Sequence, residues 1–435
     1  MIWWLYNLVF PVAYALLLPH FFLRMWRRGG YRRDFCQRFA RYRREAAALL
    51  DAPGRPVWIQ AVSVGELAVA FSLMDELRRI DPAVRFVLTC NTSTGHALAL
   101  QRLAPPDATL YFPMDVPGVM RRALDRIRPS AIVLVENEIW PNWIRCAGKR
   151  GIPAIMVNGR ISTHSHKGYR KLRCFTRDLL PRIRWFCMQT DGDRDRLLDL
   201  GAPADRMEIT GSAKYDISPT PPEARDRARA VLDRAGVGRG RRILVGGSTW
   251  DGEEAALLDF YARNRAAHPD WFLVLVPRHA ERRAAVLEAI AARKLTVLQR
   301  SQFPDGAPAP AEVPDVLLVD TTGELRGFYA AADVVFVGKS LTQTGGQNPI
   351  EPARDGRPVV VGPHMENFPG ISDDFARAGA WVQVKDAQEL GETLERLLST
   401  PAECVRLGSA AAALVDARAG ATRRMAERIH ALRIR

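Results

Sequence analysis

The 435-residue chain lacks the cysteine spacing of a disulfide framework or a zinc site. Its six cysteines are scattered without any Cys-x-x-Cys pair, at positions 36, 90, 146, 174, 187 and 404. This pattern is typical of reduced thiols in the cytosol. His164 and His166 have no partner acid next to them in the sequence, which favours surface positions over a metal site. We therefore expect neither a metal nor a resident cofactor.

Common nucleotide-binding motifs are also missing. The chain has no G-x-G-x-x-G sequence and no P-loop, so a dinucleotide-dependent enzyme or an ATPase receives little support. The net charge of +14 favours an acidic partner: nucleic acid, an anionic membrane or a phosphorylated substrate. No nucleic-acid motif accompanies the basic residues, so nucleic acid is not an expected partner.

Charge is absent from residues 3–23, which contain no Asp, Glu, Lys or Arg. As a helix this segment would extend about 30 Å, the thickness of the hydrocarbon core of a bilayer. Residues 24–44 then carry nine arginines and one acid, an arrangement that indicates the cytoplasmic, anionic-lipid side. We expect a membrane-anchoring helix, with a helix buried in the domain as the alternative. Pro11 and Pro19 leave open whether the segment spans the membrane or lies in one leaflet.

The rest of the chain is too long for one ordinary core, and two domains of about 200 residues each are expected. From Val57 onward, short β-rich runs alternate with helical patterns, which predicts an α/β protein with parallel sheets covered on both faces. A proline-rich, polar stretch at 218–230 interrupts this alternation, which restarts at Arg241. The predicted domains are 51–217 and 218–435, preceded by the anchor and basic segment 1–50.

The sequence leaves the placement of the final helix open and makes a separate prediction for one loop. The final helix, after Ala410, fits either half of the chain. The loop 303–314, FPDGAPAPAEVP, is predicted to be exposed and mobile. Two halves facing a cleft would place their ligands at the carboxyl ends of the strands.

The stretch QAVSVGELAVA, residues 60–70, places a single acid where a strand turns into a helix. Ser63 and Glu66 match the S-x-x-E capping box, which explains the acid by itself and stabilises a helix by about 1 kcal/mol. The same place, the carboxyl end of a parallel strand, is where such sheets expose catalytic groups. Glu66 is therefore either a helix cap or a general base.

The second half has a similar turn in GGQNPIEPA, residues 345–353. Gly345 and Gly346 let backbone approach a ligand, and a helix start after them can bind an anion. Asn348 suits the N-cap and Glu351 the third helical position, so a well-capped helix is the alternative. Glu351 could instead face a ribose.

Other strand ends carry further candidates. Arg278 could clamp a phosphate or make a surface salt bridge. Asp251 and Glu254 could cap the helix after GGST, and Lys214 precedes the interdomain break. Glu136 and Glu138 follow one strand, and only one of this alternating pair need point toward a ligand.

The order of nine motifs is more specific than any one of them: VSVGE, NEIWPN, NGRIS, GSAKYD, GSTWDGEE, VPRHAER, DTTGEL, GGQNPIEPA and GPHMENF. Together they closely resemble the bacterial Kdo transferases of lipopolysaccharide synthesis. These enzymes transfer 3-deoxy-D-manno-oct-2-ulosonic acid (Kdo) from CMP-Kdo to a lipid A precursor. The resemblance covers nearly the whole chain, including the apolar N-terminal segment and its arginines.

The resemblance implies a GT-B fold, with the acceptor in the N-terminal Rossmann-like domain and the nucleotide sugar in the C-terminal one. It implies inversion at the anomeric carbon without a metal, at the cytoplasmic face of the inner membrane. Catalytic positions that match the family are Glu66 as general base, Glu138 and Lys214. The matching donor-binding positions are Ser248, Arg278, His279, Gly345, Gly346, Asn348 and Glu351.

The chain departs from the family at Gln60, Trp250 and Gln347, where the family usually has His, and at Asn137, where Thr is usual. These differences keep two alternatives open. One is a related GT-B transferase with another activated sugar or lipid acceptor. The other is a non-catalytic membrane protein that binds anionic lipid or sugar nucleotide, against which the retained Glu66, Arg278 and Glu351 argue.

Overall fold

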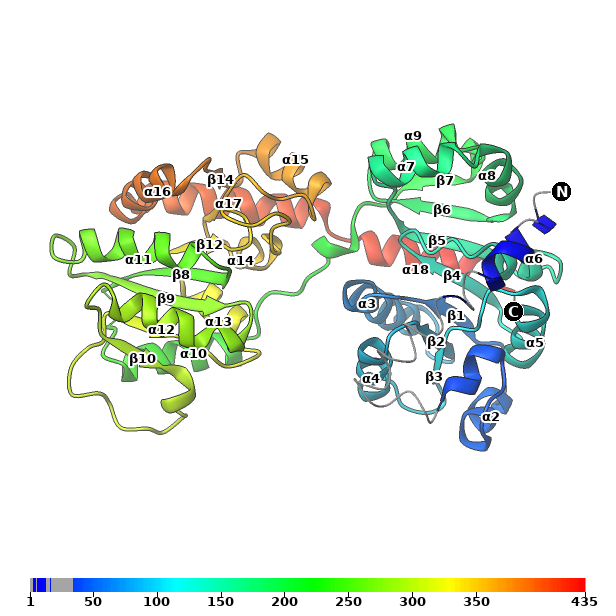
Figure 1. Ribbon diagram of the computed structural model, residues 1–435, viewed down its shortest axis with the longest axis horizontal. Coiled ribbons are helices and arrows are strands. Elements are labelled where there is room, and N and C mark those ends of the chain that lie inside the picture. The colour runs from blue at the N-terminus through cyan, green and yellow to red at the C-terminus, as the bar shows by residue number, and fades with distance from the viewer. Residues whose placement is uncertain (1–2, 5, 13–15, 17–33, 239, 435) are drawn as a thin grey trace. The chain divides into compact units, whose positions relative to one another are not determined.

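A computed structural model of the chain describes residues 3–4, 6–12, 16, 34–238 and 240–434. It forms two compact units, each with its own sheet (Figure 1). Unit 1 contains the residues up to Lys214 together with the stretch from Gly420 onward, and unit 2 is Tyr215–Ala419. The predicted α/β class with two parallel sheets is confirmed.

Unit 1 is built on seven parallel strands in the order β3-β2-β1-β4-β5-β6-β7. Their bounds are β1 Val57–Gln60, β2 Phe86–Cys90, β3 Ala108–Tyr111, β4 Ala131–Val135, β5 Ala154–Gly159, β6 Trp185–Met188 and β7 Met207–Ile209. The central strands are buried along their whole length because helices cover both faces of the sheet. The strand order reverses between β1 and β4, which makes their carboxyl ends the topological switch point.

Helices cover both faces of this sheet. They are η1 Phe35–Phe39, α2 Arg44–Asp51, α3 Val64–Ile80, α4 Ser93–Arg102, α5 Pro117–Ile127, α6 Pro141–Gly148, α7 Thr163–Arg170, α8 Arg173–Leu179, η2 Leu180–Arg182, α9 Asp191–Asp199, η3 Ala204–Arg206 and α18 Ala421–Leu432. One core lies on the side of α3 and α18, and the other packs around Trp143 on the side of α5, α6 and α8. η4, Ala213–Tyr215, joins the two units.

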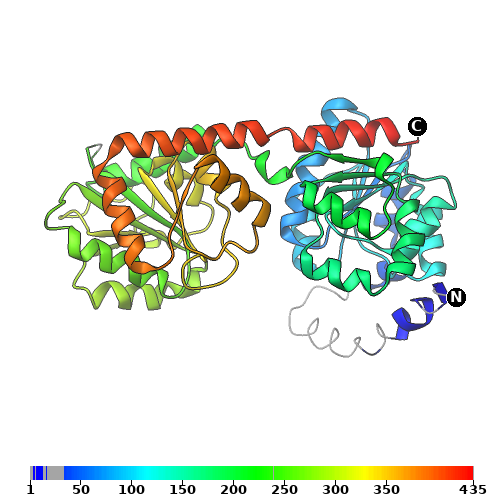
Figure 2. The same cartoon turned by 90° about the horizontal axis from the view of Figure 1, so that it is seen from above.

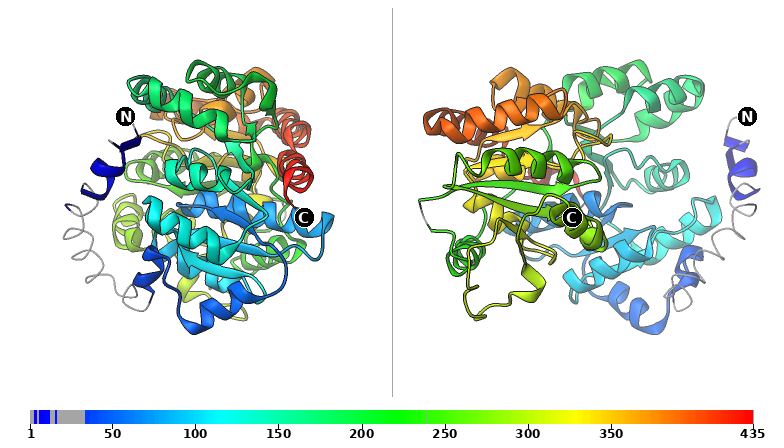
Figure 3. Two further views of the ribbon diagram at one scale, coloured as in Figure 1. Left: turned by 90° about the vertical axis from the view of Figure 1, so that its right-hand side faces the viewer. Right: turned by 60° about the vertical axis from the view of Figure 1, so that its left-hand side comes forward.

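Helix α18 differs from the predicted domain bounds, because it belongs to unit 1 although it follows the whole of unit 2. Met425 and Ile429 are fully buried in the core that also contains residues of α3. The Arg428 guanidinium pairs with Glu208 at 2.8 Å, and Arg433 pairs with Asp81. Figures 2 and 3 show α18 in red and the N-terminal residues in dark blue on opposite sides of unit 1.

Unit 2 repeats the architecture with the parallel order β10-β11-β9-β8-β12-β13-β14. Its strands are β8 Arg242–Thr249, β9 Trp271–Pro277, β10 Val297–Gln299, β11 Val316–Leu318, β12 Val334–Val337, β13 Val359–Val361 and β14 Val382–Gln383. Its helices are α10 Pro222–Arg234, α11 Glu253–Asn264, η5 Ala280–Arg282, α12 Arg283–Ala291, η6 Arg300–Gln302, α13 Leu325–Ala331, α14 Ile350–Arg354, α15 Pro369–Ala378, α16 Ala387–Ser399 and α17 Pro401–Arg418. Here the order reverses between β8 and β12.

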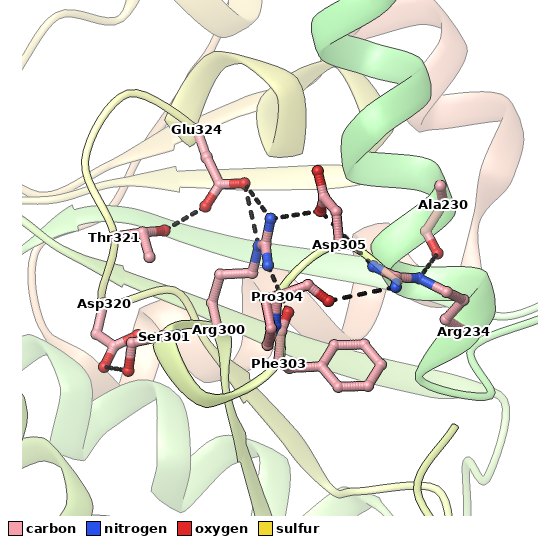
Figure 4. A network of polar contacts seen from close by, with 10 residues as sticks. All are labelled: Ala230, Arg234, Arg300, Ser301, Phe303, Pro304, Asp305, Asp320, Thr321 and Glu324. Carbon is pink, nitrogen blue, oxygen red and sulfur yellow. Dashed lines mark hydrogen bonds and ion pairs between the residues drawn. The ribbon is translucent and has the colours of Figure 1, made fainter. Parts of the chain in front are cut away.

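The predicted exposed loop 303–314 of unit 2 is largely exposed, but its base is tied to the fold. The guanidinium of Arg300 is buried and pairs with Glu324 at 2.9 Å and with Asp305 at 2.8 Å (Figure 4). It also donates to the carbonyl of Phe303. A buried guanidinium with these acceptors fixes the first residues of the loop.

The expected membrane anchor lies partly outside the described residues, at positions 13–15 and 17–23. Residues 3–4, 6–12 and 16 are helical. Over the part of the chain that the structure describes, none of the helices combines the length and apolarity needed to cross a membrane.

Candidate functional site

The switch point of unit 1 brings together the acids predicted from the sequence. Glu66 lies in the first turn of α3, after β1, and Glu138 lies in the loop after the neighbouring strand β4. Glu136 begins this loop with a positive φ of 58°. The pKa of Glu138 is raised to about 7, mainly by burial and also by the charges of Glu66 and Glu136. The acids are therefore close enough to affect one another's ionisation.

Glu66 makes the predicted capping box. Its backbone N–H donates to Ser63 Oγ at 3.2 Å, and its carboxylate accepts from Val62 N–H at 2.7 Å and from Ser63 Oγ at 3.0 Å. The side chain is half-buried. A carboxylate has about four lone-pair positions, so each oxygen keeps one for a further donor. The capping role is thus observed, and it leaves the carboxylate able to accept from a substrate.

Gln60 occupies the centre of this region, which the sequence did not indicate. It is the last residue of β1 and is fully buried. Its side-chain oxygen accepts from Thr89 Oγ1 at 2.6 Å, and its amide hydrogen-bonds to Glu138. The departure from the family at this position therefore contacts one of the candidate catalytic acids directly.

Lys214 lies on the same side of unit 1, paired electrostatically with Glu136. Burial lowers the pKa of the Lys214 ammonium, and the Glu136 carboxylate opposes this effect. Asn158 holds the segment before it: Asn158 Oδ1 accepts from Ala213 N–H at 3.0 Å, and Asn158 Nδ2 donates to Glu136 at 3.4 Å. The sequence had not identified Asn158 as a positioning residue, because its φ of 51° and its contacts appear only in the fold.

In unit 2 the candidate donor residues gather at the carboxyl ends of β9, β8 and β12, three neighbouring strands. Ser248 has a φ of 53° and hydrogen-bonds to the buried Tyr329 hydroxyl. The charges of Glu351 and Arg278 both act on the pKa of Tyr329, which burial raises strongly. Ser248, Arg278 and Glu351 therefore all act on one buried tyrosine that the sequence analysis did not single out.

The glycine turn is formed but is occupied by the protein's own groups. Gly345 and Gly346 have φ values of 120° and 73°, conformations that glycine adopts readily. The Gly345 N–H donates to the Glu366 carboxylate at 2.7 Å, and the Gly346 N–H donates to the Lys339 carbonyl at 2.7 Å. A carboxylate thus already takes the position expected for an anion.

The capping pattern after this turn is shifted by one residue. Helix α14 begins at Ile350 with Pro349 as its N-cap. Asn348 Oδ1 accepts from the Ile350 N–H at 3.2 Å, and Asn348 Nδ2 donates to Glu351 at 3.2 Å. Burial raises the pKa of Glu351.

Trp250, which stands at a usual His position, packs between two basic residues. The ring centroids of Trp250 and His279 lie 5.3 Å apart, and Lys339 Nζ lies 4.7 Å from the Trp250 centroid. His279 itself is exposed. An aromatic face and a cation are therefore present where the family has an imidazole.

Glu253 is a further residue that the sequence analysis missed. Helix α11 has Gly252 as its N-cap and no side-chain cap, so the predicted capping by Asp251 is not observed. The fully buried carboxylate of Glu253 instead accepts backbone N–H groups, at 2.8–2.9 Å, from Trp250, Lys339, Ser340 and Leu341. It therefore fixes the loop after β12, which carries Lys339.

Metal-binding geometry is not evident in the described parts of the chain, where no group of three or more His, Cys, Asp and Glu side chains could hold an ion. His166 does have a partner acid, contrary to the expectation from sequence. Its Nε2 lies 2.9 Å from Asp199 Oδ2, and Arg173 pairs with the same carboxylate.

Comparison with known proteins extends these observations. A family model described as 3-deoxy-D-manno-octulosonic-acid transferase (kdotransferase) matches residues 33–217. The 3-deoxy-D-manno-octulosonic acid transferase of Bordetella pertussis is 36% identical over 96% of this chain and 97% of its own length. The enzyme of the same name from Haemophilus influenzae is 29% identical over 97% of this chain and 96% of its own length.

Among solved structures, a glycosyltransferase from Rickettsia africae has a TM-score of 0.56 at 11% identity, over 87% of this chain and 98% of that one. At this identity the likeness concerns the fold alone, two parallel α/β units of the GT-B kind. The near full-length relatives carry the functional conclusion: the chain belongs to the 3-deoxy-D-manno-octulosonic acid transferase family and is a glycosyltransferase.

Proposed function

We propose that this enzyme moves Kdo from CMP-Kdo to a lipid A precursor in lipopolysaccharide synthesis, with inversion at the anomeric carbon. The observation that supports this most is that Glu66 and Glu138 follow the paired strands β1 and β4 at the switch point of unit 1, in a chain of this family. Unit 1 binds the acceptor, and unit 2 binds the donor.

In the proposed step, Glu66 accepts the proton of the acceptor hydroxyl through a carboxylate lone pair that the cap leaves open. The hydroxyl oxygen forms a bond to the anomeric carbon of Kdo as the bond from that carbon to the phosphate of CMP breaks. The bonding electrons leave with CMP, and Glu66 holds the proton. Glu138, linked to Gln60, orients the acceptor beside the base.

Arg278 and the glycine turn of unit 2 meet the phosphate charge of the donor. The phosphate replaces the Glu366 carboxylate at the Gly345 N–H, since both are anionic acceptors for the same donor. Ser248, Asn348 and Glu351 line the nucleotide position, with His279 beside them. Lys214 meets negative charge that develops on the donor in the transition state.

The membrane surface is the third proposed partner, at the cytoplasmic face of the inner membrane. Trp4, Leu8 and Val12, spaced four apart on one helical face, are 83%, 66% and 53% exposed. The other face is tied to unit 1: Tyr6 Oη donates to Asp115 at 2.8 Å, and Trp3 Nε1 donates to Asp178 at 2.6 Å. A helix docked on one side and apolar on the other suits the interface of an anionic bilayer, which also attracts the arginines that follow.

The direct test is incubation of the folded full-length protein with CMP-Kdo and a tetra-acylated lipid A precursor. We expect a product whose mass has increased by at least one Kdo residue, detected by mass spectrometry. Absence of product would rule the proposal out, provided that the melting curve of the same protein shows that both units are folded.

A second candidate is a related GT-B transferase with a different activated sugar. It is favoured by Gln60 and Trp250, which contact candidate site residues where the family usually has His. Calorimetry distinguishes the two: CMP binding tighter than UDP binding supports Kdo transfer, and the reverse order supports the second candidate.

A further inference from the structure

Unit 1 contains an apolar pocket of about 640 Å³, which lies outside the polar switch point but reaches it. The pocket is lined by the N-terminal residues Tyr6, Val9 and Phe10 and by Leu172 and Phe175 of the α7–α8 region. Glu138 lines the pocket as well. The volume is within the range of small-molecule sites, about 300–1,000 Å³.

Several polar side chains that line the pocket already form hydrogen bonds within the protein. Tyr6 Oη donates to Asp115 at 2.8 Å, and Thr176 Oγ1 donates to the Leu200 carbonyl at 2.8 Å. Trp140 Nε1 donates to Glu138 Oε2 at 2.8 Å. A sugar or a phosphate would leave its own polar groups without partners over most of this surface, which is unfavourable. An aliphatic chain has no polar groups to leave without partners. Its burial there would be favourable by about 0.8 kcal/mol for each methylene.

The pocket extends from Glu138, next to the candidate catalytic acids, to the exposed N-terminal helix. At one end Glu138 belongs to the loop after β4, beside the strand that leads to Glu66. At the other end Val9 is 52% exposed, on the helix that also exposes Leu8 and Val12. A chain that leaves a bilayer along this helix would therefore enter the pocket with its polar head next to the acids.

We propose that this pocket holds one acyl chain of the lipid acceptor and thereby positions the acceptor hydroxyl for Glu66. This inference rests on the proposed function for the identity of the acceptor. It makes Leu172 and Val9 specificity-determining residues: they select an acylated acceptor over the same sugar without acyl chains. The two residues face the pocket from different elements, so each can be tested independently.

The test combines a binding and a kinetic measurement on the full-length protein. In the absence of membranes, a fluorescent fatty acid is titrated into wild type, Leu172→Trp and Val9→Trp, and is then displaced with tetradecanoate. Both residues are at least half exposed, at 54% and 52%, so tryptophan narrows the pocket without disrupting the core. We expect saturable binding by wild type and at least tenfold weaker binding by either variant.

Val405→Trp provides the matched control, because Val405 is 68% exposed on α17 of unit 2. Its fatty-acid affinity should equal that of wild type. In the transfer assay, wild type should have a KM at least tenfold lower for the tetra-acylated acceptor than for its fully deacylated counterpart. The two pocket variants should reduce this ratio toward one.

The outcomes separate the pocket from the reaction. Kdo transfer with equal KM for both acceptors and no saturable fatty-acid binding would overturn the acyl-chain proposal while leaving the proposed function intact. Saturable fatty-acid binding that tryptophan does not weaken at either position would also overturn it, because the chain would then bind elsewhere. Absence of transfer to either acceptor would refute the proposed function, and the fatty-acid titration would still decide on the pocket.

Discussion

At the scale of single residues, Glu66 forms the predicted cap in a way that is compatible with its proposed role as general base. Its carboxylate accepts from Val62 and Ser63 and so closes the first turn of α3. The same hydrogen bonds fix the carboxylate at the carboxyl end of β1, where an acceptor would bind. A cap and a base are therefore compatible on one side chain, because two bonds use only half of its acceptor positions.

A pair of substitutions separates the two roles. Glu66→Gln keeps an oxygen for the cap but removes the base, so turnover should fall by about 10²–10⁴-fold with little change in melting temperature. Ser63→Ala removes the cap and should lower the free energy of unfolding by about 1 kcal/mol, with a loss of turnover below tenfold. Steady-state kinetics and denaturant titration check both. Equal losses of turnover and stability in the two variants would reduce Glu66 to a structural cap.

Glu138 gives a pH-dependent prediction. Its pKa of about 7 in the folded protein exceeds the ordinary 4.5, so the folded state holds this proton more tightly than the unfolded state does. This contribution to stability is present below about pH 4.5 and is lost as the pH rises through about 7. Glu138→Gln lacks this titrating carboxyl. Between about pH 4.5 and 7, its free energy of unfolding should therefore fall by about 1–2 kcal/mol less than that of wild type. The difference is this small because the Glu138 side chain is only partly buried.

Denaturant titrations at several pH values measure this difference. The control is Glu427→Gln, which changes an exposed acid on α18 of the same unit. Its pH profile should run parallel to that of wild type. If Glu138→Gln also ran parallel, Glu138 would be ionised normally in the folded protein.

Some site residues could be predicted from the sequence, and others could not, for a physical reason. Glu66, Glu138 and Arg278 lie in the turns or helix starts that follow β-rich runs, so the rule for parallel sheets places them at ligand-binding edges. Glu253 has no such signal, because it stands next to Glu254 in a helix start and the sequence does not show which of the two accepts from a loop. Only the folded chain brings the N–H groups of Lys339, Ser340 and Leu341 to its carboxylate.

At the scale of elements, the central strands leave a clearer pattern in the sequence than the edge strands β3, β7 and β10 do. Strands such as β4 and β9 are continuous apolar runs because they are covered on both faces. The edge strands β3, β7 and β10 have the short sequences ATLY, MEI and VLQ and include exposed or half-buried positions. Strands of this kind bury less surface and leave a weaker pattern in the sequence.

The N-terminal helix carries a prediction at this scale. Trp4→Asp combined with Leu8→Asp should abolish sedimentation with anionic vesicles at physiological salt, because both exposed side chains would lose their favourable transfer into the interface. Leu100→Asp, on the exposed face of α4 in the same unit, is the matched control and should bind as wild type does. Unchanged binding of the double variant that disappears in high salt would assign the attraction to the arginines instead.

At the scale of the whole molecule, the chain enters unit 2 at Tyr215 and returns to unit 1 at Gly420. The helical pattern of α18 was visible in the sequence, but its partner was not, because an apolar stripe fits any complementary surface. Met425 and Ile429 pack in the core that also contains residues of α3, and this packing assigns α18 to unit 1. A domain boundary drawn from the order of segments alone could not anticipate this return.

This arrangement predicts which unit each C-terminal helix supports. Met425→Ala in α18 should destabilise unit 1 by about 2–5 kcal/mol and leave the unfolding of unit 2 unchanged. Leu407→Ala in α17 should do the reverse, since Leu407 is buried in a core of unit 2. Hydrogen exchange followed by peptide mass spectrometry resolves the two units. Weakened protection of unit 2 peptides in Met425→Ala would contradict the assignment.

The return of α18 to unit 1 also bears on biosynthesis. A ribosome must translate all of unit 2 before it supplies the residues that cover α3. Unit 1 therefore stays incomplete in the nascent chain, while unit 2, made later, can already close its own core. A message truncated shortly before codon 420 would therefore release a chain with a finished unit 2 and an exposed apolar face on unit 1. Such a product would be recognisable to chaperones and proteases by that face, because unit 1 closes its core only after unit 2 has been translated.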